Sequence, residues 1–411
     1  MLVTGSELVR GDRADQNGPF LARSLTSLGL EPAEVLIVGD AEAELERALR
    51  DGLEHDLLVI SGGLGPTHDD RTVELLARAT GRALAVDEEL AARIEAWSRE
   101  AAARLGRPYA DFAEGVRKQA SLPAGALVVG IAGTAPSLVL EAGGCVAVTL
   151  PGPPRELRAL WPRVLETEPL RRLLARAPVP ERRVLRFYGV PESAVAQVLA
   201  EAGGEGDGVD ATICARDFEL HVDLLVSPGA SRRADALEAA LAGPLERFLF
   251  SRSEAPIEEL VLELCRGRGL TLAAAESCTG GMVAARLTSV PGSSDVFVGG
   301  VVAYANAVKA ALLGVPEEVL REHGAVSAEA ASAMAAGARH RLGADLAVSV
   351  TGVAGPGGGT EEKPVGLVYL CAAGPGGERA IELGLPGDRA TVRARATVAA
   401  LHLVRRLVTE S

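Results

Sequence analysis

The feature that most constrains the fold is an alternation of short apolar runs with segments of helical periodicity. In the first part of the chain, apolar runs bounded by Gly or Pro lie at 36–38, 57–60 and 145–150. Between them, apolar side chains recur at helical spacing over 19–28, 42–50 and 72–79. Strands that alternate with helices predict a largely parallel sheet with helices on both faces. We therefore expect residues 1–168 to form an α/β/α domain.

The same alternation resumes beyond residue 250. Strands are expected at 271–275, 296–303, 346–350 and 365–372, and helices at 280–289, 328–341 and 389–407. Residues 251–411 are therefore a second predicted α/β/α domain, which opens with a linker-like segment. Between the two, residues 169–250 show two half-exposed strand patterns and two helical patterns, which is typical of a small α+β module. The predicted fold class is α/β, with two α/β/α domains joined by this module.

The middle module contains the loop Gly203-Gly-Glu-Gly, which matches the G-x-x-G loop of RNA-binding KH modules. Glu205 lies inside the loop, and the module carries 10 basic and 12 acidic residues. The whole chain has 42 basic and 55 acidic residues and a net charge of −13. Because this charge repels phosphates, it argues against partners such as nucleic acid or an anionic membrane. We expect a KH-like fold that acts as a spacer or a dimer-forming element.

Cysteine usage and hydropathy indicate a reducing compartment. The chain has five Cys without paired spacing, which predicts neither a disulfide framework nor a Cys/His zinc site. Pro123 and Pro136 interrupt the uncharged stretch at 119–140, which favours short buried strands over a membrane span. Polar residues follow Met1 too early for a signal peptide. We therefore expect a cytoplasmic protein.

A glycine-rich turn in the first domain predicts a phosphate site. The segment Leu57-Leu-Val-Ile-Ser-Gly-Gly-Leu-Gly-Pro-Thr-His-Asp-Asp joins a buried strand to a helix. Glycine N–H groups can close on phosphate oxygens, and a pair of Asp can hold a divalent cation that binds the phosphate in turn. The expected cradle is Gly62, Gly63, Gly65 and Thr67, and the expected metal ligands are Asp69, Asp70, Asp40 and Glu7. Glu7, Asn17 and Asp40 enter because polar residues at strand ends share one crevice. An ordinary helix N-terminus is the alternative reading.

A second candidate site opens at Ser277, Cys278 and Thr279, three consecutive possible nucleophiles between a strand and a helix. The free N–H groups of a helix N-terminus favour a developing oxyanion, which we expect near Thr279 to Gly281. Gly280 and Gly281 let a substrate approach closely. The alternative is a Ser/Thr helix cap without chemistry.

Lys309 is the predicted base for this nucleophile. Only three of the 42 basic residues are Lys, and a Lys, unlike Arg, can be tuned to lose its proton. Burial would have to lower its pKa by roughly 3 units from about 10.4. Tyr304 and Asn306 lie beside it, and His323 is an alternative base for Cys278.

A phosphate-bearing substrate is suggested by two further segments. Thr351-Gly-Val-Ala-Gly-Pro-Gly-Gly-Gly is dense in glycine, so we expect Thr351, Gly352, Gly355 and Gly357 to contact a ligand. Arg389 opens the last predicted helix, where a phosphate monoester would bind well. The residues alone therefore predict a serine–lysine hydrolase acting on a small phosphate ester.

The glycine-rich turn, with Gly133-Thr-Ala-Pro and Leu150-Pro-Gly-Pro-Pro, resembles the amino-terminal domain of the CinA (competence/damage-inducible) family. That domain is related to molybdopterin-binding domains, and in CinA proteins it is associated with metal-dependent ADP-ribose pyrophosphatase activity. The resemblance covers residues 1–168 and implies cleavage of ADP-ribose to AMP and ribose 5-phosphate with a divalent metal ion. Ser137 stands where the family usually has Gly. A domain that only binds a pterin or nucleotide is the alternative.

Residues 271–408 resemble nicotinamide-nucleotide amidases, the carboxy-terminal CinA domain. The matching motifs include Ala275-Glu-Ser-Cys-Thr-Gly-Gly, Pro291-Gly-Ser-Ser, Tyr304-Ala-Asn-Ala-Val-Lys, His323-Gly-Ala-Val-Ser and Glu362-Lys-Pro-Val-Gly. The resemblance implies cofactor-free hydrolysis of nicotinamide mononucleotide to nicotinate mononucleotide and ammonia. Ser277 would attack, neutral Lys309 would take its proton, and Tyr304 would relay a proton to ammonia. Both substrates belong to pyridine-nucleotide salvage, and we expect a homodimer. An interaction protein in competence or DNA damage is the alternative.

Overall fold

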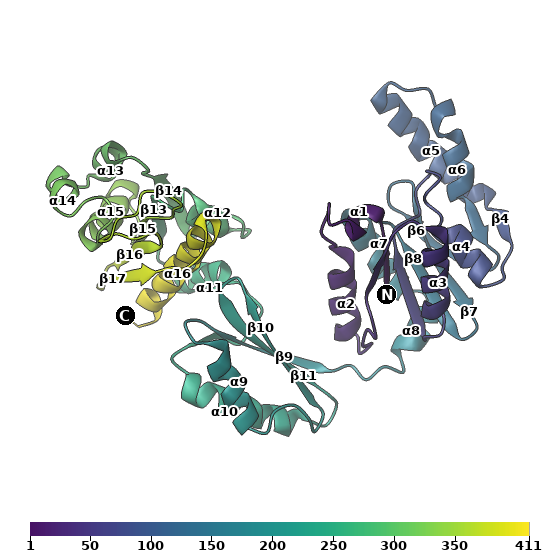
Figure 1. The fold of residues 1–411 in the computed structure, drawn as a ribbon, viewed down its shortest axis with the longest axis horizontal. Helices are drawn as coiled ribbons and strands as arrows, with labels where there is room; N and C mark the ends of the chain where they lie inside the picture. The colour runs from purple at the N-terminus through teal and green to yellow at the C-terminus, as the bar shows by residue number, and fades with distance from the viewer. Residues whose placement is uncertain (411) are drawn as a thin grey trace. The chain divides into compact units, whose positions relative to one another are not determined.

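The computed structural model describes residues 1–410, with side chains for 1–110 and 113–410 (Figure 1). By contact density the chain divides into two compact units, residues 1–182 with 225–231 and residues 183–224 with 232–411. The first unit holds a six-stranded sheet, and the second holds a four-stranded and a five-stranded sheet.

The six-stranded sheet has the order β2-β1-β3-β8-β7-β6. Its strands are β1 (Leu2–Thr4), β2 (Leu36–Val38), β3 (Leu57–Ser61), β6 (Leu127–Ile131), β7 (Pro136–Ala142) and β8 (Cys145–Leu150). The strands β2, β1, β3 and β8 are parallel, whereas β7 and β6 add an antiparallel hairpin. The helices of this unit are α1 (Ser6–Val9), α2 (Asn17–Ser27), α3 (Glu42–Gly52), α4 (Thr72–Ala79), α5 (Glu88–Leu105), α6 (Ala110–Gln119), α7 (Pro154–Leu165) and α8 (Glu168–Leu174). A small antiparallel pair, β4 (Leu84–Val86) and β5 (Ser121–Pro123), flanks α5 and α6.

The core lies on both faces of this sheet because successive strand residues point in opposite directions. Val59 and Val148 belong to the same cluster as Trp161 of α7, on one face. Leu58 and Ile60 belong to the cluster that α3 and α4 complete on the other face. The continuous apolar character of β3 therefore follows from its burial on both sides.

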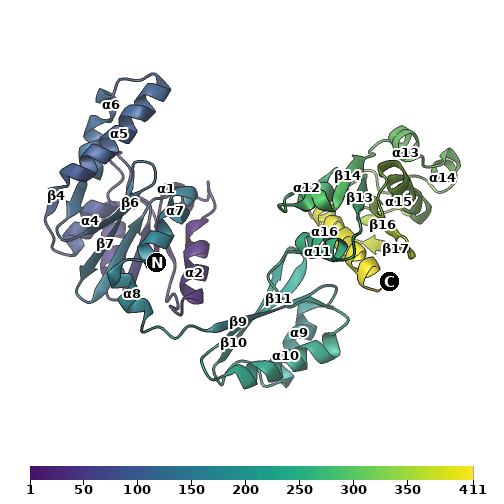
Figure 2. The ribbon, with the colours of Figure 1, turned by 180° about the vertical axis from the view of Figure 1, so that it is seen from behind.

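The second unit contains two sheets. The four-stranded sheet has the order β10-β11-β9-β12, and α9 (Glu192–Glu201) and α10 (Ser231–Leu245) cover one of its faces (Figure 2). Its strands are β9 (Glu181–Phe187), β10 (Val209–Arg216), β11 (Glu219–Val226) and β12 (Leu249–Ser251). The five-stranded sheet has the order β14-β13-β15-β16-β17. Its strands are β13 (Leu272–Glu276), β14 (Phe297–Val302), β15 (Leu346–Gly352), β16 (Leu367–Gly374) and β17 (Gly377–Gly384).

Helices cover both faces of the five-stranded sheet. They are α11 (Ile257–Gly267), α12 (Met282–Thr288), α13 (Asn306–Leu313), α14 (Glu317–Glu322), α15 (Ala328–Leu342) and α16 (Arg389–Thr409). Val348 and Val350 pack with α11, α12 and α16, whereas Ala273 and Ala275 pack with α13 and α15. The strands β14, β13 and β15 are parallel, so their carboxyl ends lie at one edge of the sheet.

The four-stranded sheet is attached to α16 through a buried polar pair. His402 Nε2 lies 2.8 Å from Glu219 Oε1, and Tyr188 stacks on the His402 ring at a centroid distance of 3.7 Å. Burial lowers the pKa of His402 to about 4 although Glu219 opposes the shift. Burial alone would raise the pKa of Glu219, but the hydrogen bonds of His221 and His402 bring it to about 2. At neutral pH the pair is therefore an uncharged imidazole that donates to a carboxylate.

The predicted fold class is confirmed, and β5, β6 and β7 confirm the short strands expected within 119–140. The large sheets are less parallel than predicted, because each ends in an antiparallel hairpin, β7–β6 or β16–β17. The domain boundaries 1–168, 169–250 and 251–411 stay predictions. Among residues 1–410, no helix has the length and apolar character that a membrane crossing needs.

We predict that His402 makes the stability of the second unit depend on pH. An unfolded His takes up a proton near its ordinary pKa of 6.5, whereas folded His402 does so only near pH 4. The free energy of unfolding should therefore fall, by an amount on the order of 2–3 kcal/mol, as pH drops through this window. His402→Gln keeps a donor for Glu219 without titrating, so its loss should be shallower in urea unfolding followed by circular dichroism. An equally steep loss in the variant would contradict the assignment.

Candidate functional site

The carboxyl ends of β13, β14 and β15 position the candidate nucleophile. Ser277 directly follows β13, and its N–H donates to Val350 O at 2.8 Å, which extends the pairing with β15. On the other side, the N–H of Ala303 donates to Glu276 O at 2.8 Å beyond the end of β14. The backbone around Ser277 is therefore fixed from both neighbouring strands, as expected for the crevice of an open α/β sheet.

Lys309 lies in contact with Ser277, as predicted. Its Nζ is 3.0 Å from Ser277 Oγ, 2.9 Å from Ala303 O and 3.2 Å from Tyr304 O. The Lys309 side chain is only 1% exposed and Ser277 is 8% exposed. Burial lowers the pKa of Lys309 because the charged form loses its hydration. With no carboxylate among these partners, the amine is stabilised in its neutral form.

The three partners suit both protonation states of this amine. A neutral amine has two N–H groups, which the carbonyls of Ala303 and Tyr304 accept, and one lone pair, which faces the hydroxyl of Ser277. A protonated amine has three N–H groups and finds three acceptors in the same places. Lys309 can therefore take and return a proton at Ser277 without leaving a buried group unpaired.

The alternative nucleophile and base are less suited to catalysis. Burial raises the pKa of the Cys278 thiol to about 11, so it stays protonated near neutral pH. The His323 ring lies beside an exposed carboxylate, with Nδ1 3.5 Å from Glu329 Oε1. The geometry therefore favours the pair Ser277 and Lys309.

Two residues that the sequence analysis did not identify hold the turn at Ser277. The Glu276 carboxylate accepts hydrogen bonds from the N–H groups of Gly281, Val283 and Ala284 at 2.9, 3.1 and 2.9 Å. Arg393 of α16 donates to Cys278 O at 3.0 Å and to Thr279 O at 2.7 Å. A Glu immediately before the nucleophile was the only sequence signal, and the contact of Arg393 spans more than 110 positions.

These bonds correct the predicted oxyanion site. The N–H of Gly281 is taken by Glu276, and that of Gly280 donates to Ser277 O at 3.1 Å. The N–H groups of Cys278 and Thr279 lie at the Cys278 thiol, where they partly offset the rise in its pKa. Of the three expected donors, the N–H of Thr279 remains a candidate, because the Cys278 thiol beside it is only a weak acceptor. The buried Thr279 hydroxyl has no hydrogen-bond partner in the described part of the chain.

The predicted residues around Ser277 differ in exposure, because Tyr304 and Asn306 lie at the surface and Thr351 is buried. The exposed ring of Tyr304 carries a hydroxyl that accepts from Arg389 Nη2 at 2.8 Å, and Arg389 Nη1 donates to Gly355 O at 2.8 Å. Tyr304 contacts Lys309 through its carbonyl, which lies 3.2 Å from Nζ, and the expected proton relay by its hydroxyl stays a prediction. Asn306 begins α13 at the surface. Thr351 is buried, and its hydroxyl donates to Ala325 O at 2.6 Å.

Packing explains two glycines of the loop that follows β15. A Cβ at Gly352 would lie 2.7 Å from Leu367 O, and one at Gly355 would lie 2.6 Å from Val365 Cγ1. Contacts within the protein are therefore enough to require glycine at both positions, and their contact with a ligand stays a prediction. A Cβ at Gly357 would meet open space, so this position remains available to a substrate.

The predicted site of the amino-terminal unit is a cavity of about 510 Å³. Its lining includes seven of the predicted residues, namely Glu7, Asp40, Gly62, Gly63, Gly65, Asp69 and Asp70. It also includes residues that the sequence analysis did not assign, among them Arg13, Asp15, Gln119 and Glu156. Thr67 lies next to it and donates from Oγ1 to Asp70 Oδ2 at 2.5 Å. The structure therefore brings together the parts of the site that the strand ends predicted.

Hydrogen bonds fix the walls of this cavity. Asp40 Oδ2 accepts from Ser6 Oγ at 2.6 Å, and Asn17 Nδ2 donates to Ser61 Oγ at 2.9 Å and to Gly152 O at 2.7 Å. Gln119 Nε2 donates to Leu64 O at 2.9 Å and so holds the glycine-rich turn from behind. Burial raises the pKa of Glu156, which also lines the cavity.

The donor set suits a hard cation only in part. Carboxylate oxygens are preferred ligands of Mg²⁺ and similar ions. Within the described part of the chain, no three His, Cys, Asp or Glu side chains converge enough to hold a metal by themselves. The residues therefore fit a cation held by one or two carboxylates and by substrate oxygens, a common mode for Mg²⁺, and not an all-protein cage.

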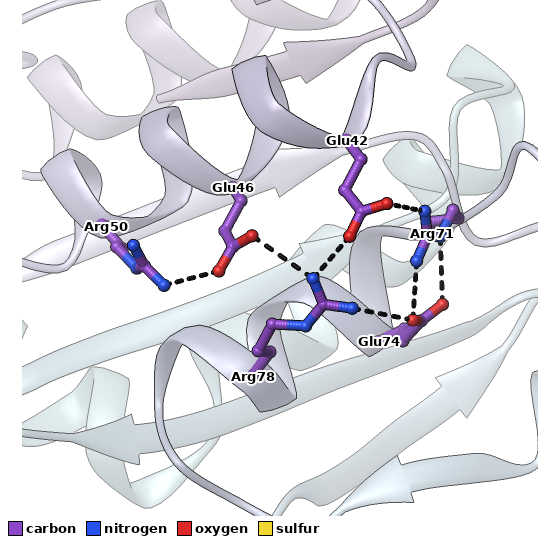
Figure 3. Close-up of polar contacts among 6 residues, drawn as sticks. All are labelled: Glu42, Glu46, Arg50, Arg71, Glu74 and Arg78. Atoms are coloured by element: carbon purple, nitrogen blue, oxygen red, sulfur yellow. Dashed lines mark hydrogen bonds and ion pairs between the residues drawn. The ribbon is translucent and has the colours of Figure 1, made fainter.

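An ion-pair network anchors the helix that follows the Asp pair (Figure 3). Arg71, next to Asp70, binds Glu42 at 2.5 Å and Glu74 at 2.7 Å, and Arg78 binds Glu42 at 2.5 Å. Single exposed pairs contribute only about 0.2–1 kcal/mol, but a shared network orients its members. The network joins α3 to α4 and so restrains the end of the loop that carries Asp69 and Asp70.

Comparisons with known proteins cover both units. A family model described as the CinA C-terminal domain matches residues 254–408, and one described as a probable molybdopterin binding domain matches residues 1–172. A CinA-like protein of Mycolicibacterium vanbaalenii is 44% identical over 416 residues, which cover 100% of this chain and 98% of that protein. A CinA-like protein of Mycobacterium tuberculosis is 42% identical and covers 99% of this chain and 96% of its own length. The crystal structure of the competence/damage inducible protein CihA from Agrobacterium tumefaciens is 42% identical, covers 38% of this chain and 99% of its own, and has a TM-score of 0.36.

We predict that Gly63 is structurally essential to the cavity. It has a φ of +66°, and a Cβ would lie 2.2 Å from Thr72 Oγ1, whereas Gly81 has a φ of +64° and open space around it. Gly81→Ala should cost roughly 1–2 kcal/mol for the left-handed backbone. Gly63→Ala should cost about 1–3 kcal/mol more because Thr72 must move away. Urea unfolding of the two variants compares these costs, and equal values would refute the close packing.

Proposed function

This chain belongs to the CinA family, and we propose that its carboxy-terminal domain hydrolyses nicotinamide mononucleotide to nicotinate mononucleotide and ammonia. The observation that carries the proposal is the 3.0 Å contact between the buried Lys309 Nζ and Ser277 Oγ. This contact supports nucleophilic catalysis by a serine that a neutral lysine activates. The choice of the carboxamide as substrate rests on the resemblance described above.

The proposed reaction uses these groups in sequence. Neutral Lys309 accepts the Ser277 proton while Oγ attacks the carboxamide carbon, and the N–H of Thr279 is the candidate donor to the oxyanion. Lys309 then returns the proton to the leaving ammonia, because its Nζ is in contact with Ser277 Oγ. Relay through the Tyr304 hydroxyl, which accepts from Arg389 and keeps its own proton, is the alternative. Water, activated by Lys309, releases the acyl group and regenerates Ser277.

Arg389 is the candidate partner of the substrate phosphate. Its contacts with Gly355 O and the Tyr304 hydroxyl use two of its five N–H groups. The remaining N–H groups and the position of Arg389 in the first turn of α16 suit a phosphate monoester. This would place the phosphate away from Lys309, whose neutral form the adjacent charge would otherwise disfavour.

We also propose that the amino-terminal domain uses a divalent metal ion to cleave ADP-ribose to AMP and ribose 5-phosphate. When bound, such an ion would neutralise the phosphate charge and polarise the bond that breaks. Asp69 and Asp70, with Asp40 and Glu7 as further candidates, would hold it at the cavity wall. The glycine-rich turn would cradle the phosphates. A domain that binds a pterin or nucleotide without turnover is the second candidate, supported by the matching molybdopterin-binding model. A cytoplasmic location and a homodimer stay predictions.

Ser277→Ala and Lys309→Arg should each abolish ammonia release from nicotinamide mononucleotide. The first removes the nucleophile, and the second puts a permanently charged group where a neutral amine is needed. Cys278→Ala should keep activity, and Lys363→Arg is the matched control because Lys363 donates to His323 O at the surface. Ammonia release, with circular dichroism to check folding, measures the effect. An active Lys309→Arg would contradict the lysine base.

The pH dependence gives a check on the same assignment. The base must be deprotonated, so kcat/KM should rise with pH through the pKa of Lys309, which burial holds below its ordinary value of 10.5. The rising limb should therefore lie below that value in the wild type. A rising limb near pH 10.5 would mean that the Lys309 amine is exposed to water, which would contradict its burial.

Asp69→Asn and Asp70→Asn should lower AMP formation from ADP-ribose by about 100-fold or more, because each removes a charge that would hold the cation. Asp51→Asn, on the exposed surface of α3, is the matched control. AMP formation with and without added divalent metal, together with metal titration by calorimetry, gives the readout. Unchanged rates in both variants would refute the metal assignment.

A further inference from the structure

We infer that Glu276 and Arg393 are positioning residues that set the geometry of Ser277 by binding the backbone of its turn from opposite sides. The inference rests on the proposed amidase function and deepens it by naming residues that act through Ser277. Neither side chain needs to touch the substrate. We define the segment 277–281, which these two residues hold, as the nucleophile turn.

Glu276 binds the amides at the end of the nucleophile turn. Its carboxylate is 1% exposed and accepts three backbone N–H groups, from Gly281 and from Val283 and Ala284 in the first turn of α12. A buried carboxylate is costly unless it is hydrogen-bonded, and these charge-assisted bonds, at 2.9–3.1 Å, meet that need. The start of α12 is thereby tied to the last residue of β13.

Arg393 binds the carbonyls on the other side of the nucleophile turn. Its Nε and Nη2 donate to consecutive carbonyls, Cys278 O and Thr279 O. The fork of the guanidinium matches two adjacent acceptors, which a lysine ammonium cannot do with the same geometry. Because Arg393 lies on α16, one turn beyond Arg389, the same helix would orient both the nucleophile turn and the substrate phosphate.

The consequence for Ser277 follows from how little freedom the turn retains. Ser277 N–H is bonded to Val350 O, Gly280 N–H to Ser277 O, and the next two carbonyls to Arg393. Glu276 holds this segment in two ways. Its carboxylate accepts the N–H groups at the end of the nucleophile turn, and its own carbonyl accepts from Ala303 N–H. Lys309 can serve as base only while Ser277 Oγ stays within hydrogen-bond reach. A displacement of about 1 Å is enough to cost on the order of 100-fold in rate.

The test uses four variants of the full chain. Glu276→Gln puts an amide nitrogen among three N–H donors, and Arg393→Gln removes the fork. Arg393→Lys keeps the charge and is the conservative rescue, and Arg395→Gln is the matched control, because Arg395 lies on the same helix over the Phe218 ring. Ammonia release from nicotinamide mononucleotide gives kcat and KM, and the p-nitrophenol burst from p-nitrophenyl acetate gives the acylation rate of Ser277.

We expect kcat and the burst rate to fall about 100-fold in Glu276→Gln and Arg393→Gln, with KM changed less than about threefold. Arg393→Lys should recover part of the loss, and the rising limb of the pH profile should stay in place because Lys309 is untouched. Folded variants that keep kcat and burst rate, even with a lower melting temperature, would overturn the inference. If Glu276→Gln does not fold, the comparison of Arg393→Gln with Arg393→Lys decides.

The two readouts separate this inference from the proposed function. Wild-type protein that shows the burst but releases no ammonia would refute the amidase proposal, while a lower burst in the variants would still support positioning. Ammonia release that the variants leave unchanged would refute positioning and leave the amidase proposal standing. Wild-type protein that shows neither reaction would refute both.

Discussion

The candidate site at the carboxy-terminal sheet depends on the burial of the Lys309 amine, which is removed from water. Lys309 Nζ contacts two carbonyls and one hydroxyl, and burial lowers its pKa without a carboxylate among these partners to raise it. This arrangement requires that β13 and β14 end at the same level, because one supplies Ser277 and the other leads to Ala303 and Tyr304. The parallel pairing of these strands provides that alignment. The surroundings that lower the pKa of Lys309 therefore depend on the sheet topology.

Much of this organisation could be predicted from the sequence because it depends on local patterns. The apolar runs that end in glycine or polar residues located β3, β13 and β15, and parallel strands then bring their ends together. The pairing of Ser277 with Lys309 followed from the scarcity of Lys and from strand order. Other features depend on contacts between distant residues. Arg393 reaches the nucleophile turn across more than 110 positions, and the Tyr304 hydroxyl turns toward Arg389, which no local pattern indicates. The antiparallel direction of β7 and β16 was not predicted, because strand patterns do not carry direction, and β17 was missed because its side chains are exposed or only half-buried.

The two candidate sites differ in the charge of their surroundings. Around Lys309, the hydrogen-bond partners are uncharged, and burial lowers the pKa of the amine. In the amino-terminal cavity, the protein gathers carboxylates, including Asp40, Asp69 and Asp70, and lines them with few cations, of which Arg13 is one. An anionic pyrophosphate can approach such a wall only with a bridging cation. The two candidate sites therefore differ in charge within one acidic chain.

The contact of α16 with the four-stranded sheet bears on how this protein can be dissected. Tyr188 and Phe250 pack against the ring of His402, and Glu219 accepts from its Nε2. A fragment that begins after Ser251 would lack Tyr188, Glu219 and Phe250, so the side of α16 that carries His402 would face solvent and the imidazole would be free to take up a proton. The module before residue 251 therefore completes the packing of α16, and the chain is better divided before this module than after it.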